Sequence, residues 1–244
     1  MKLASNWLVV AVALVFPTVA LAQAEWPQWR GPKRDGVSTD TGLLKEWPSG
    51  GPKLLWEAKG AGRGYSSLSI SGGRIYTMGD GPSTAQDKDE YVLCFEEATG
   101  KQLWMAKLGP AWDKGQANWQ GSRSTPTLDG EALYALTAHG SLICLETATG
   151  KERWKKSFKN DFGGYKKDGW GYSESPLVDG DKLVCTPGGD KATMVCLDKK
   201  TGSPTWTAAL PGDPGAGHAS IVVAEVGKVR VYVTTTAGGA RGIR

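Results

Sequence analysis

The sequence predicts an all-β fold, a β-propeller of four-stranded antiparallel blades in an incomplete ring of about four blades. An eleven-residue phrase occurs three times and reads Cys, apolar, acid, two variable residues, Thr-Gly, three variable residues, Trp. The tryptophans that end it, Trp104, Trp154 and Trp206, lie 50 and 52 residues apart. Short β-type runs separated by glycine turns fill each interval, with no helical period. A period of about 40–50 residues is typical of propellers and solenoids.

The pattern within each repeat predicts three strands ahead of the closing strand that carries the tryptophan. In the second repeat, residues 128–136 read as a strand end, an Asp-Gly turn and a second strand, and residues 141–146 read as the third strand. Short β runs between glycine turns are typical of antiparallel hairpins. The third strand is a continuous apolar run, which predicts that both of its faces are covered. Blades stacked around an axis cover both faces in this way, whereas a two-layer sandwich does not.

The fourth strand follows a Thr-Gly turn. Glycine supplies the positive φ that such a turn needs. The acid ahead of the turn either accepts hydrogen bonds from N–H groups of the turn or is a solvated surface acid. The recurring cysteine predicts a small apolar filler between blades, and the recurring tryptophan predicts a large one. The repeat positions are Trp56, Gly100, Trp104, Gly150, Trp154, Gly202 and Trp206.

The repeats predict an N-terminal segment at residues 25–52 and a partial propeller at residues 53–244. Trp56 precedes Trp104 by about one repeat length, so it has the position of the tryptophan in a closing fourth strand. No pattern for the first three strands of that blade precedes it. Residues 207–244 open a further repeat and stop inside its third strand. This pattern predicts a truncated product or fragment, and the alternative is a dimer in which two chains complete one ring. Open ends leave unpaired backbone and apolar faces exposed to water.

The repeats resemble those of the pyrroloquinoline-quinone (PQQ)-like β-propeller family, whose repeat ends roughly in Leu-Asp-x-x-Thr-Gly-x-x-x-Trp. The opening Trp-Pro-Gln-Trp-Arg-Gly-Pro of residues 26–32 resembles the start of secreted bacterial members. The resemblance implies a quinoprotein-like, BamB-like propeller, and PQQ with Ca²⁺ is implied by it alone. Quinoprotein alcohol dehydrogenases carry two adjacent cysteines, which this chain lacks, and no Cys-x-x-Cys-His haem motif occurs. No cysteine lies at the signal cleavage site, as it would in a BamB-like lipoprotein.

The first 24 residues predict a cleaved signal peptide. Lys2 gives a positive start, and the apolar run at residues 8–16 is too short to cross a bilayer. We therefore expect a periplasmic or secreted protein with no transmembrane segment after signal cleavage. For the cysteines we expect free, buried thiols. Cys185 and Cys196 share one hairpin and are the only pair for which a disulfide is plausible.

Charge and spacing argue against two classes of partner. The net charge is +4, and the basic residues are scattered apart from residues 151–159 and 166–167. Such runs are typical of a solvated edge, so we expect no nucleic-acid binding. The polar insertion at residues 80–90 lacks metal-loop spacing. It predicts a solvated hairpin loop, and we assign no metal site.

A binding site is predicted where the blades begin. A glycine-led loop precedes the first strand of every repeat, at residues 64–67, 121–125, 171–175 and 217–220. Because the repeats are equivalent, these loops share one face and ring the mouth of the channel. Two longer connections, which carry further aromatic residues, reach the same rim, and aromatics beside polar groups in long loops suit binding. The candidate residues are Tyr65, Trp119, Arg123, Trp170, Glu174 and His218.

Each candidate also has a plain structural interpretation. Trp119 and Trp170 either bind a ligand or plug the tops of blades, and Arg123 and Glu174 either read a ligand or pair with each other. His218 is either a base or a hydrogen-bonded loop residue.

The leading functional hypothesis is an exported, non-catalytic propeller that acts as a binding or scaffold protein through its channel face. Its partner is a protein, or else a small-molecule or glycan ligand, and we assign no catalytic residue. The first alternative is a PQQ-dependent oxidoreductase of the quinoprotein dehydrogenase type. The second is a carbohydrate-binding propeller that uses Trp119 and Trp170.

Overall fold

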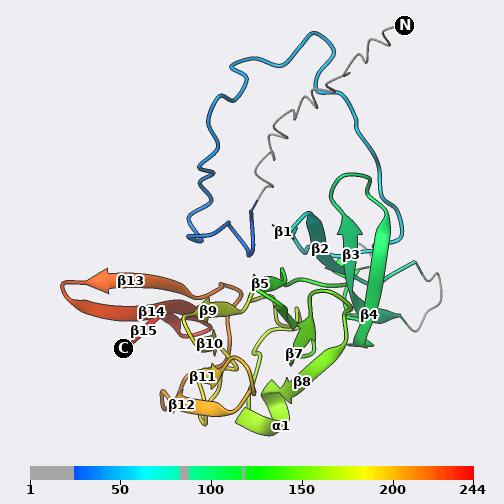
Figure 1. Cartoon of the computed structure of the whole chain (residues 1–244). Coiled ribbons are helices and arrows are strands. Elements are labelled where there is room, and N and C mark those ends of the chain that lie inside the picture. Colours follow the sequence, from blue (N-terminus) through cyan, green and yellow to red (C-terminus); the bar gives the residue numbers. More distant parts are fainter. Residues whose placement is uncertain (1–24, 83–87, 117–118) are drawn as a thin grey trace, which may run out of the picture.

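The computed structural model describes residues 25–82, 88–116 and 119–244, and the predicted signal peptide lies outside them. Within these residues, strands form four antiparallel sheets that follow one another along the chain (Figure 1). The first sheet contains β1 (Ser69–Ser71), β2 (Arg74–Gly79), β3 (Asp89–Glu96) and β4 (Gln102–Pro110). The second contains β5 (Thr127–Asp129), β6 (Ala132–Leu136), β7 (Ser141–Glu146) and β8 (Glu152–Ser157). The third contains β9 (Leu177–Asp179), β10 (Lys182–Cys185), β11 (Met194–Asp198) and β12 (Pro204–Ala208).

The last sheet has three strands: β13 (Val222–Val226), β14 (Val229–Thr236) and β15 (Gly239–Ile243). In every sheet the strands pair in chain order, as blades of a propeller do. The predicted all-β class, the four-stranded antiparallel blades and the incomplete ring are therefore confirmed.

One short helix interrupts the β pattern. Helix α1 (Phe158–Phe162) follows β8, and the side chain of its N-cap, Ser157, accepts a hydrogen bond from the N–H of Asn160. Gly163 ends the helix with a φ of 65°. Phe158 and Phe162 are both buried, so this single turn anchors the start of a long connection against the core.

A tryptophan and a tyrosine close each seam between blades. Trp104 Nε1 donates a hydrogen bond to the carbonyl of Thr147 in the next blade at 3.1 Å, and the Tyr76 hydroxyl donates to the same oxygen at 3.3 Å. A Cβ at Gly150 would lie 2.7 Å from the Trp104 ring, so only glycine fits this turn. The following seam repeats the arrangement with Trp154, Tyr134, Lys199 and Gly202.

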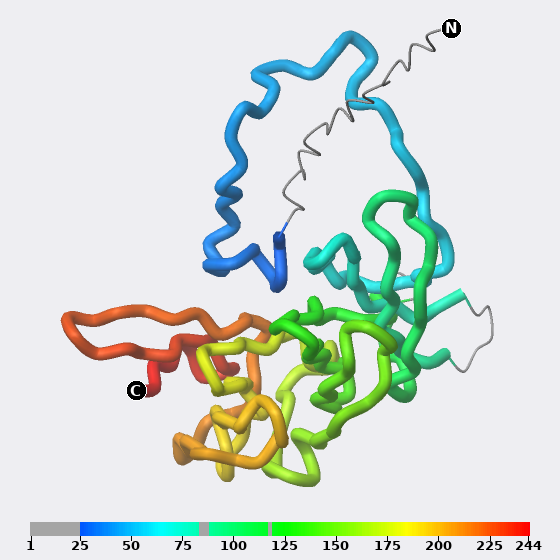
Figure 2. Tube along the Cα trace, viewed as in Figure 1, coloured from blue at the N-terminus to red at the C-terminus, as the bar shows by residue number. Residues whose placement is uncertain are grey.

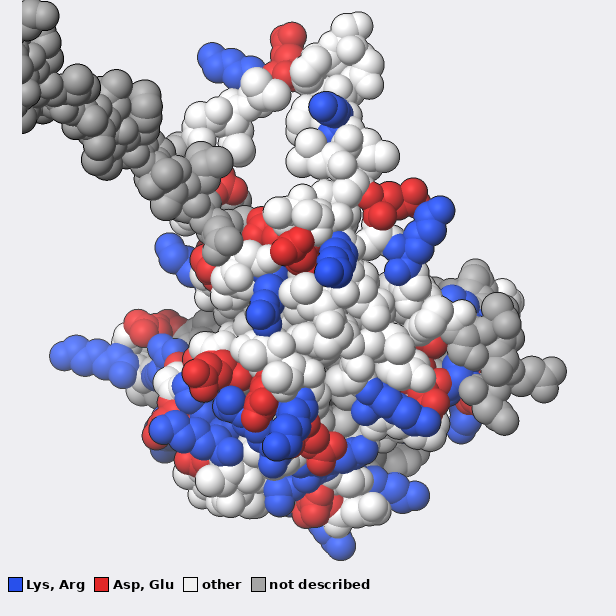
Figure 3. All heavy atoms as spheres, turned by 45° about the vertical axis from the view of Figure 1, so that its right-hand side comes forward, with Lys and Arg blue, Asp and Glu red and all other residues white. Residues whose placement is uncertain are grey.

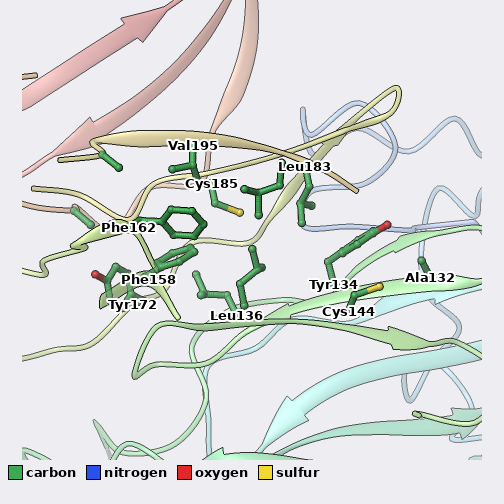
Figure 4. Close-up of a cluster of buried hydrophobic side chains, with 14 residues drawn as sticks. Ala132, Tyr134, Leu136, Cys144, Phe158, Phe162, Tyr172, Leu183, Cys185 and Val195 are labelled. Atoms are coloured by element: carbon green, nitrogen blue, oxygen red, sulfur yellow. The ribbon is translucent and has the colours of Figure 1, made fainter. Parts of the chain in front are cut away.

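The core consists of apolar clusters between neighbouring blades. The largest lies between the second and third sheets, where Tyr134 and Cys144 face Leu183 and Cys185 (Figure 4). Cys196 belongs to a different cluster, between the third and fourth sheets. Cys185 and Cys196 therefore lie on opposite faces of one sheet, which is incompatible with a disulfide between them. All four thiols are free and buried.

The N-terminal segment crosses the first strands of three blades. Trp26 exchanges two backbone hydrogen bonds with Ile70 at 2.8 and 2.9 Å, and the carbonyl of Pro27 accepts from the N–H of Leu128 at 2.7 Å. Arg34 then reaches the loop that leads into β9, where it donates to the carbonyl of Ser175 at 2.8 Å. Beyond this contact the chain arches away from the blades (Figure 2). The arch carries the exposed side chains Val37, Leu43, Leu44, Trp47, Leu54 and Leu55.

Candidate functional site

Four equivalent loops lie side by side at one end of the blades, and we call them the rim loops (residues 64–67, 121–125, 171–175 and 217–220). Each is joined to the next by a backbone N–H that donates to a side-chain hydroxyl. Ser67 donates to Thr125 at 3.0 Å, Thr125 to Ser175 at 3.0 Å, and Ser175 to Ser220 at 2.9 Å. Equivalent positions of successive repeats therefore face one another along the rim.

An aromatic platform surrounds one cation on this rim. The guanidinium carbon of Arg123 lies 5.5 Å from the ring centroid of Tyr65 and 5.6 Å from that of Trp170. Arg123 also donates to the backbone carbonyl of Trp119, whose ring centroid lies 4.8 Å from that of Trp170. We call these four residues the rim platform. Such cation–π contacts orient the guanidinium and the rings together.

The rim platform faces solvent with its rings while its cation is partly buried. Tyr65, Trp170 and Trp119 are 55%, 39% and 36% exposed. The Nε atom of Arg123 is buried and has no hydrogen-bond partner within the described residues. Burial lowers the pKa of Arg123, and the nearby Tyr65 and Asp168 oppose that shift. The platform therefore combines exposed apolar surface with a desolvated positive charge, a combination suited to binding.

A polar cluster continues the rim beside the platform, and we call it the Asp168 cluster. Asp168 Oδ2 lies 2.7 Å from Lys166 Nζ and 2.8 Å from His218 Nε2, and Oδ1 accepts from the N–H of Trp170 at 3.0 Å. Ser173 Oγ lies 3.0 Å from His218 Nδ1. Burial raises the pKa of Asp168, but the hydrogen bonds from Lys166 and Trp170 outweigh it, so the pKa lies below its usual range.

Five of the six candidates predicted from the sequence lie on this rim, and Glu174 lies beneath it. Its side chain is buried, with Oε2 accepting from the N–H of Thr186 at 2.8 Å and Oε1 without a partner in the described residues. Burial raises the pKa of Glu174 to about 8, against the opposing charge of Arg34. Glu174 therefore interacts with Thr186 and Arg34, rather than with Arg123.

Sequence reasoning did not single out Asp168, and it missed the buried acids at both ends of the polar insertion. It placed Lys166 on a solvated basic edge, which is wrong because this side chain is 6% exposed and pairs with Asp168. Residues 83–87 lie outside the described residues, but Asp80 and Glu90 are both buried. Asp80 pairs with Arg63 at 2.7 Å, and Glu90 accepts from the N–H of Ala138 at 3.1 Å. Burial raises the pKa of Glu90 to about 7. The expectation of a solvated loop is therefore wrong at these two positions, because Asp80 directly follows β2 and Glu90 lies within β3, where the blade is packed.

The residues of the rim also allow a test of the cofactor that the resemblance implies. A Ca²⁺ ion takes six to eight oxygen ligands, mainly carboxylates and carbonyls. In the part of the chain that the structure describes, no three His, Cys, Asp or Glu side chains gather into a metal-coordinating group. The carboxylate of Asp168 is already shared by Lys166 and His218. Within the described residues, the acid at the rim is therefore held by basic side chains, and no cluster of carboxylates adjoins it.

Surface charge and membrane segments complete the description of the site. On the face that Figure 3 shows, lysine and arginine side chains lie among aspartates and glutamates. No helix in residues 25–82, 88–116 or 119–244 combines the length and the apolar character that a bilayer span needs.

Stacked blades whose seams are closed by tryptophan and tyrosine side chains define a propeller of PQQ-like repeats, with a mixed aromatic and charged rim. The family model described as "Outer membrane protein assembly factor BamB" matches residues 88–244, and the chain belongs to this family. A search of curated protein sequences finds no match.

Solved structures share the fold at low sequence identity. BamB from Moraxella catarrhalis is 15% identical with a TM-score of 0.53, over 77% of this chain and 50% of that one. Quinohemoprotein alcohol dehydrogenase from Comamonas testosteroni is 18% identical with a TM-score of 0.52, over 78% of this chain and 28% of that one. Quinohemoprotein alcohol dehydrogenase ADHIIG from Pseudomonas putida HK5 is 16% identical with a TM-score of 0.51, over 74% and 30%. The chain thus spans half or less of the length of these structures.

Proposed function

We propose that this protein is an exported binding or scaffold protein that holds a protein partner at its rim platform. The observation that carries the proposal is the position of Arg123 between the exposed rings of Tyr65 and Trp170. Residues that contribute most to protein–protein binding are enriched in tryptophan, tyrosine and arginine, and they cluster in desolvated pockets. The platform concentrates these three residue types on one surface.

Family membership supports the same role. The matching family is described as an outer membrane protein assembly factor, and the predicted signal peptide at residues 1–24 would bring the chain to the compartment where such a factor acts. Binding by a rigid rim also needs no bound cofactor. The rim loops are joined to one another by hydrogen bonds, so little order would have to be gained on association.

The test compares purified full-length chains immobilised on a resin. Wild type, Arg123→Ala, Trp170→Ala and the control Trp47→Ala are exposed to solubilised envelope of the source organism. Trp47 is as aromatic as Trp170 and well exposed, but it lies on the arch, away from the rim. We expect a protein that is retained by wild type and Trp47→Ala and lost by both rim variants. The same protein, once purified, should bind wild type at least tenfold more tightly than Arg123→Ala in titration calorimetry.

Two other outcomes would replace the proposal. Retention of a polysaccharide that depends on Trp119 and Trp170, without any protein, would make the rim a glycan-binding site. Binding of PQQ with Ca²⁺, accompanied by dye reduction, would make the protein an oxidoreductase. Equal retention of every protein by wild type and both rim variants would remove the platform from the function.

A further inference from the structure

Three side chains of the rim form a continuous hydrogen-bonded line. The hydroxyl of Ser173 lies 3.0 Å from Nδ1 of His218, and Nε2 of the same ring lies 2.8 Å from Oδ2 of Asp168. A carboxylate can only accept, so the contact with Asp168 favours a proton on Nε2 and leaves Nδ1 as an acceptor. The Ser173 hydroxyl can donate to Nδ1 at 3.0 Å, and its second acceptor, the backbone carbonyl of His218, is farther away at 3.3 Å. A hydroxyl, an imidazole and an orienting carboxylate within 2.6–3.2 Å of one another are the signature of an activated nucleophile.

The line is assembled from two separate connections that are fixed to each other. Asp168 and Ser173 come from the loop that follows α1, and His218 comes from the loop that precedes β13. A parallel bridge joins Lys166 to Ala216, with the N–H of Ala216 donating to the carbonyl of Tyr165 at 2.8 Å. Because this bridge lies next to both Asp168 and His218, their distance is set by the fold.

The same three groups are open to a substrate. The side chain of His218 is half exposed, that of Asp168 is about a third exposed, and Ser173 is partly exposed. Trp170, a member of the rim platform, lies between Asp168 and Ser173 in the chain, and its N–H donates to Asp168 Oδ1 at 3.0 Å. Two cations lie near Asp168: Lys166 pairs with it at 2.7 Å, and the charge of Arg123 interacts with it.

We propose that Ser173 is an acyl-accepting nucleophile, with His218 as its general base and Asp168 as the group that positions the imidazole. This goes beyond the proposed binding role and would add a catalytic group to a chain for which the sequence predicts none. The substrate class is a carboxylic ester with an aromatic or apolar part, which would rest on the rim platform.

The chemistry balances with water as the second reactant. Ser173 Oγ bonds to the carbonyl carbon while its proton passes to His218 Nδ1, and Asp168 stabilises the resulting imidazolium. The ester C–O bond breaks, and the proton on Nδ1 goes to the departing alkoxide. Water then attacks the acyl group, gives its proton to Nδ1, and Ser173 Oγ recovers that proton as the carboxylic acid leaves. The net reaction converts an ester and water into an acid and an alcohol.

We expect the reaction to be slow because Lys166 lies beside the carboxylate that positions the imidazole. Lys166 Nζ lies 2.7 Å from the Asp168 oxygen that also faces His218, and 3.4 Å from His218 Nε2. Its charge offsets part of the carboxylate's attraction for an imidazolium. We therefore expect activity on activated aryl esters, such as 4-nitrophenyl acetate, above all.

The experiment uses the full chain with 4-nitrophenyl acetate and with a fluorophosphonate probe. We expect the probe to label one peptide, the one that contains Ser173, and we expect Ser173→Ala and His218→Ala each to lower the hydrolysis rate at least tenfold. Asp168→Asn should lower the rate less and change its pH profile. The matched control is Ser38→Ala, because Ser38 donates to Asp40 at 2.7 Å but has no imidazole partner, and it should keep the wild-type rate.

Two results would overturn the proposal. One is probe labelling at Ser173 no greater than at Ser38. The other is a Ser173→Ala variant that hydrolyses the ester as fast as wild type, since the imidazole or another group would then act alone. Ser173→Ala removes a single oxygen, and an unchanged thermal unfolding curve would show that any loss of rate is chemical.

Discussion

Glu174 shows that the residue at one repeat position can differ between blades and still bind the equivalent backbone N–H. In the first blade the equivalent residue is Ser66, whose hydroxyl accepts a hydrogen bond from the N–H of Met78 at 3.2 Å. In the third blade Glu174 accepts from the N–H of Thr186 at 2.8 Å. The carboxyl satisfies the same donor, but it also brings an ionisable group into the interior. Its second oxygen has no partner among the described residues, so the charged form is poorly solvated there.

This burial predicts a stability that falls as pH rises. The pKa of Glu174 is raised by burial to about 8, while the unfolded chain has an ordinary value near 4.5. The folded protein therefore holds the proton more tightly, and its stabilising effect is complete below about pH 4.5 and lost as pH rises through about 8. Glu90, with a pKa raised to about 7, acts in the same direction. We expect urea unfolding to give a smaller free energy at pH 8 than at pH 5.

The variant Glu174→Gln isolates this effect. It keeps an acceptor for Thr186 but cannot ionise, so the difference in unfolding free energy between pH 5 and pH 8 should shrink. Glu225→Gln is the control, because that side chain is largely exposed and should leave the difference unchanged. A Glu174→Gln protein with the pH dependence of wild type would mean that this carboxyl does not titrate differently in the folded chain.

The sequence predicted several of the residues that lie on the rim, but it did not predict which of them contact one another. Tyr65, Arg123 and His218 align across the repeats, so equivalence alone places them together. Nothing in that alignment shows that Arg123 contacts Trp170, because Trp170 lies in a long connection whose path depends on α1 and its cap. Asp168 lies in the same connection and was missed for the same reason.

Among the elements, the closing strands of the first three blades share one cross-strand pair. Cys94 lies opposite Trp104 in the register of β3 with β4, and Cys144 lies opposite Trp154 in that of β7 with β8. A register shift follows the cysteine in both blades and again in the third. Such bulges increase the local twist of a strand. The bulge and the indole therefore act together to turn each closing strand onto the next blade.

Trp154 should be a major contributor to stability. It packs against the cluster between the second and third sheets and donates to the carbonyl of Lys199 at 3.2 Å. We expect Trp154→Ala to lower the unfolding free energy by about 3–5 kcal/mol, the usual range for an aromatic removed from a core. Gly202→Ala should also destabilise, because its φ is +69° and the new Cβ would lie 2.8 Å from the indole.

Chemical denaturation of the two variants beside wild type measures both effects. Trp47→Ala is the matched control, since it removes an equally large ring from the exposed arch. A change below about 1 kcal/mol for Trp154→Ala, the size expected of a surface substitution, would contradict the role of the indole at the seam.

Strand prediction succeeded where the pattern repeats and failed where it does not. The third strand of the second blade was predicted at residues 141–146 and is observed at Ser141–Glu146, because an apolar run between two glycine turns leaves little choice. Helix α1 was not predicted. Its five residues are too few for a helical period, and only the N-cap Ser157 and the terminal Gly163 mark it.

At the scale of the whole molecule, the N-terminal segment ties the blades together. A propeller of stacked blades contacts only nearest neighbours, so its stability is close to a sum of local terms. The segment from Trp26 onward instead touches β1 of the first blade, β5 of the second and the loop before β9 of the third. Its last contact is the buried guanidinium of Arg34, which donates to the side chain of Gln28 and to the carbonyls of Ser175 and Pro176.

Arg34 should therefore hold the segment in place for the whole molecule. Arg34→Ala removes three hydrogen bonds made by a buried charged group. The carbonyl of Ser175 loses its donor, whereas that of Pro176 keeps the hydroxyl of Thr127 at 2.6 Å. We expect a loss of about 2–4 kcal/mol in unfolding free energy. Glu174 would also lose the opposing charge beside it, which should raise its pKa further. The stability of the variant should then fall more steeply between pH 5 and pH 8 than that of wild type.

Limited proteolysis followed by mass spectrometry tests whether Arg34 holds the N-terminal segment against the blades. If Arg34 anchors the segment, Arg34→Ala should be cleaved within residues 25–36 before any blade is cut, while wild type resists there. Arg30→Ala is the control, because the exposed Arg30 side chain contacts the Asp35 carbonyl and the Trp29 ring, which both lie within the segment itself. Equal cleavage of Arg34→Ala and Arg30→Ala would mean that the backbone bonds of Trp26 and Pro27 suffice, and that the blades are held by their seams alone.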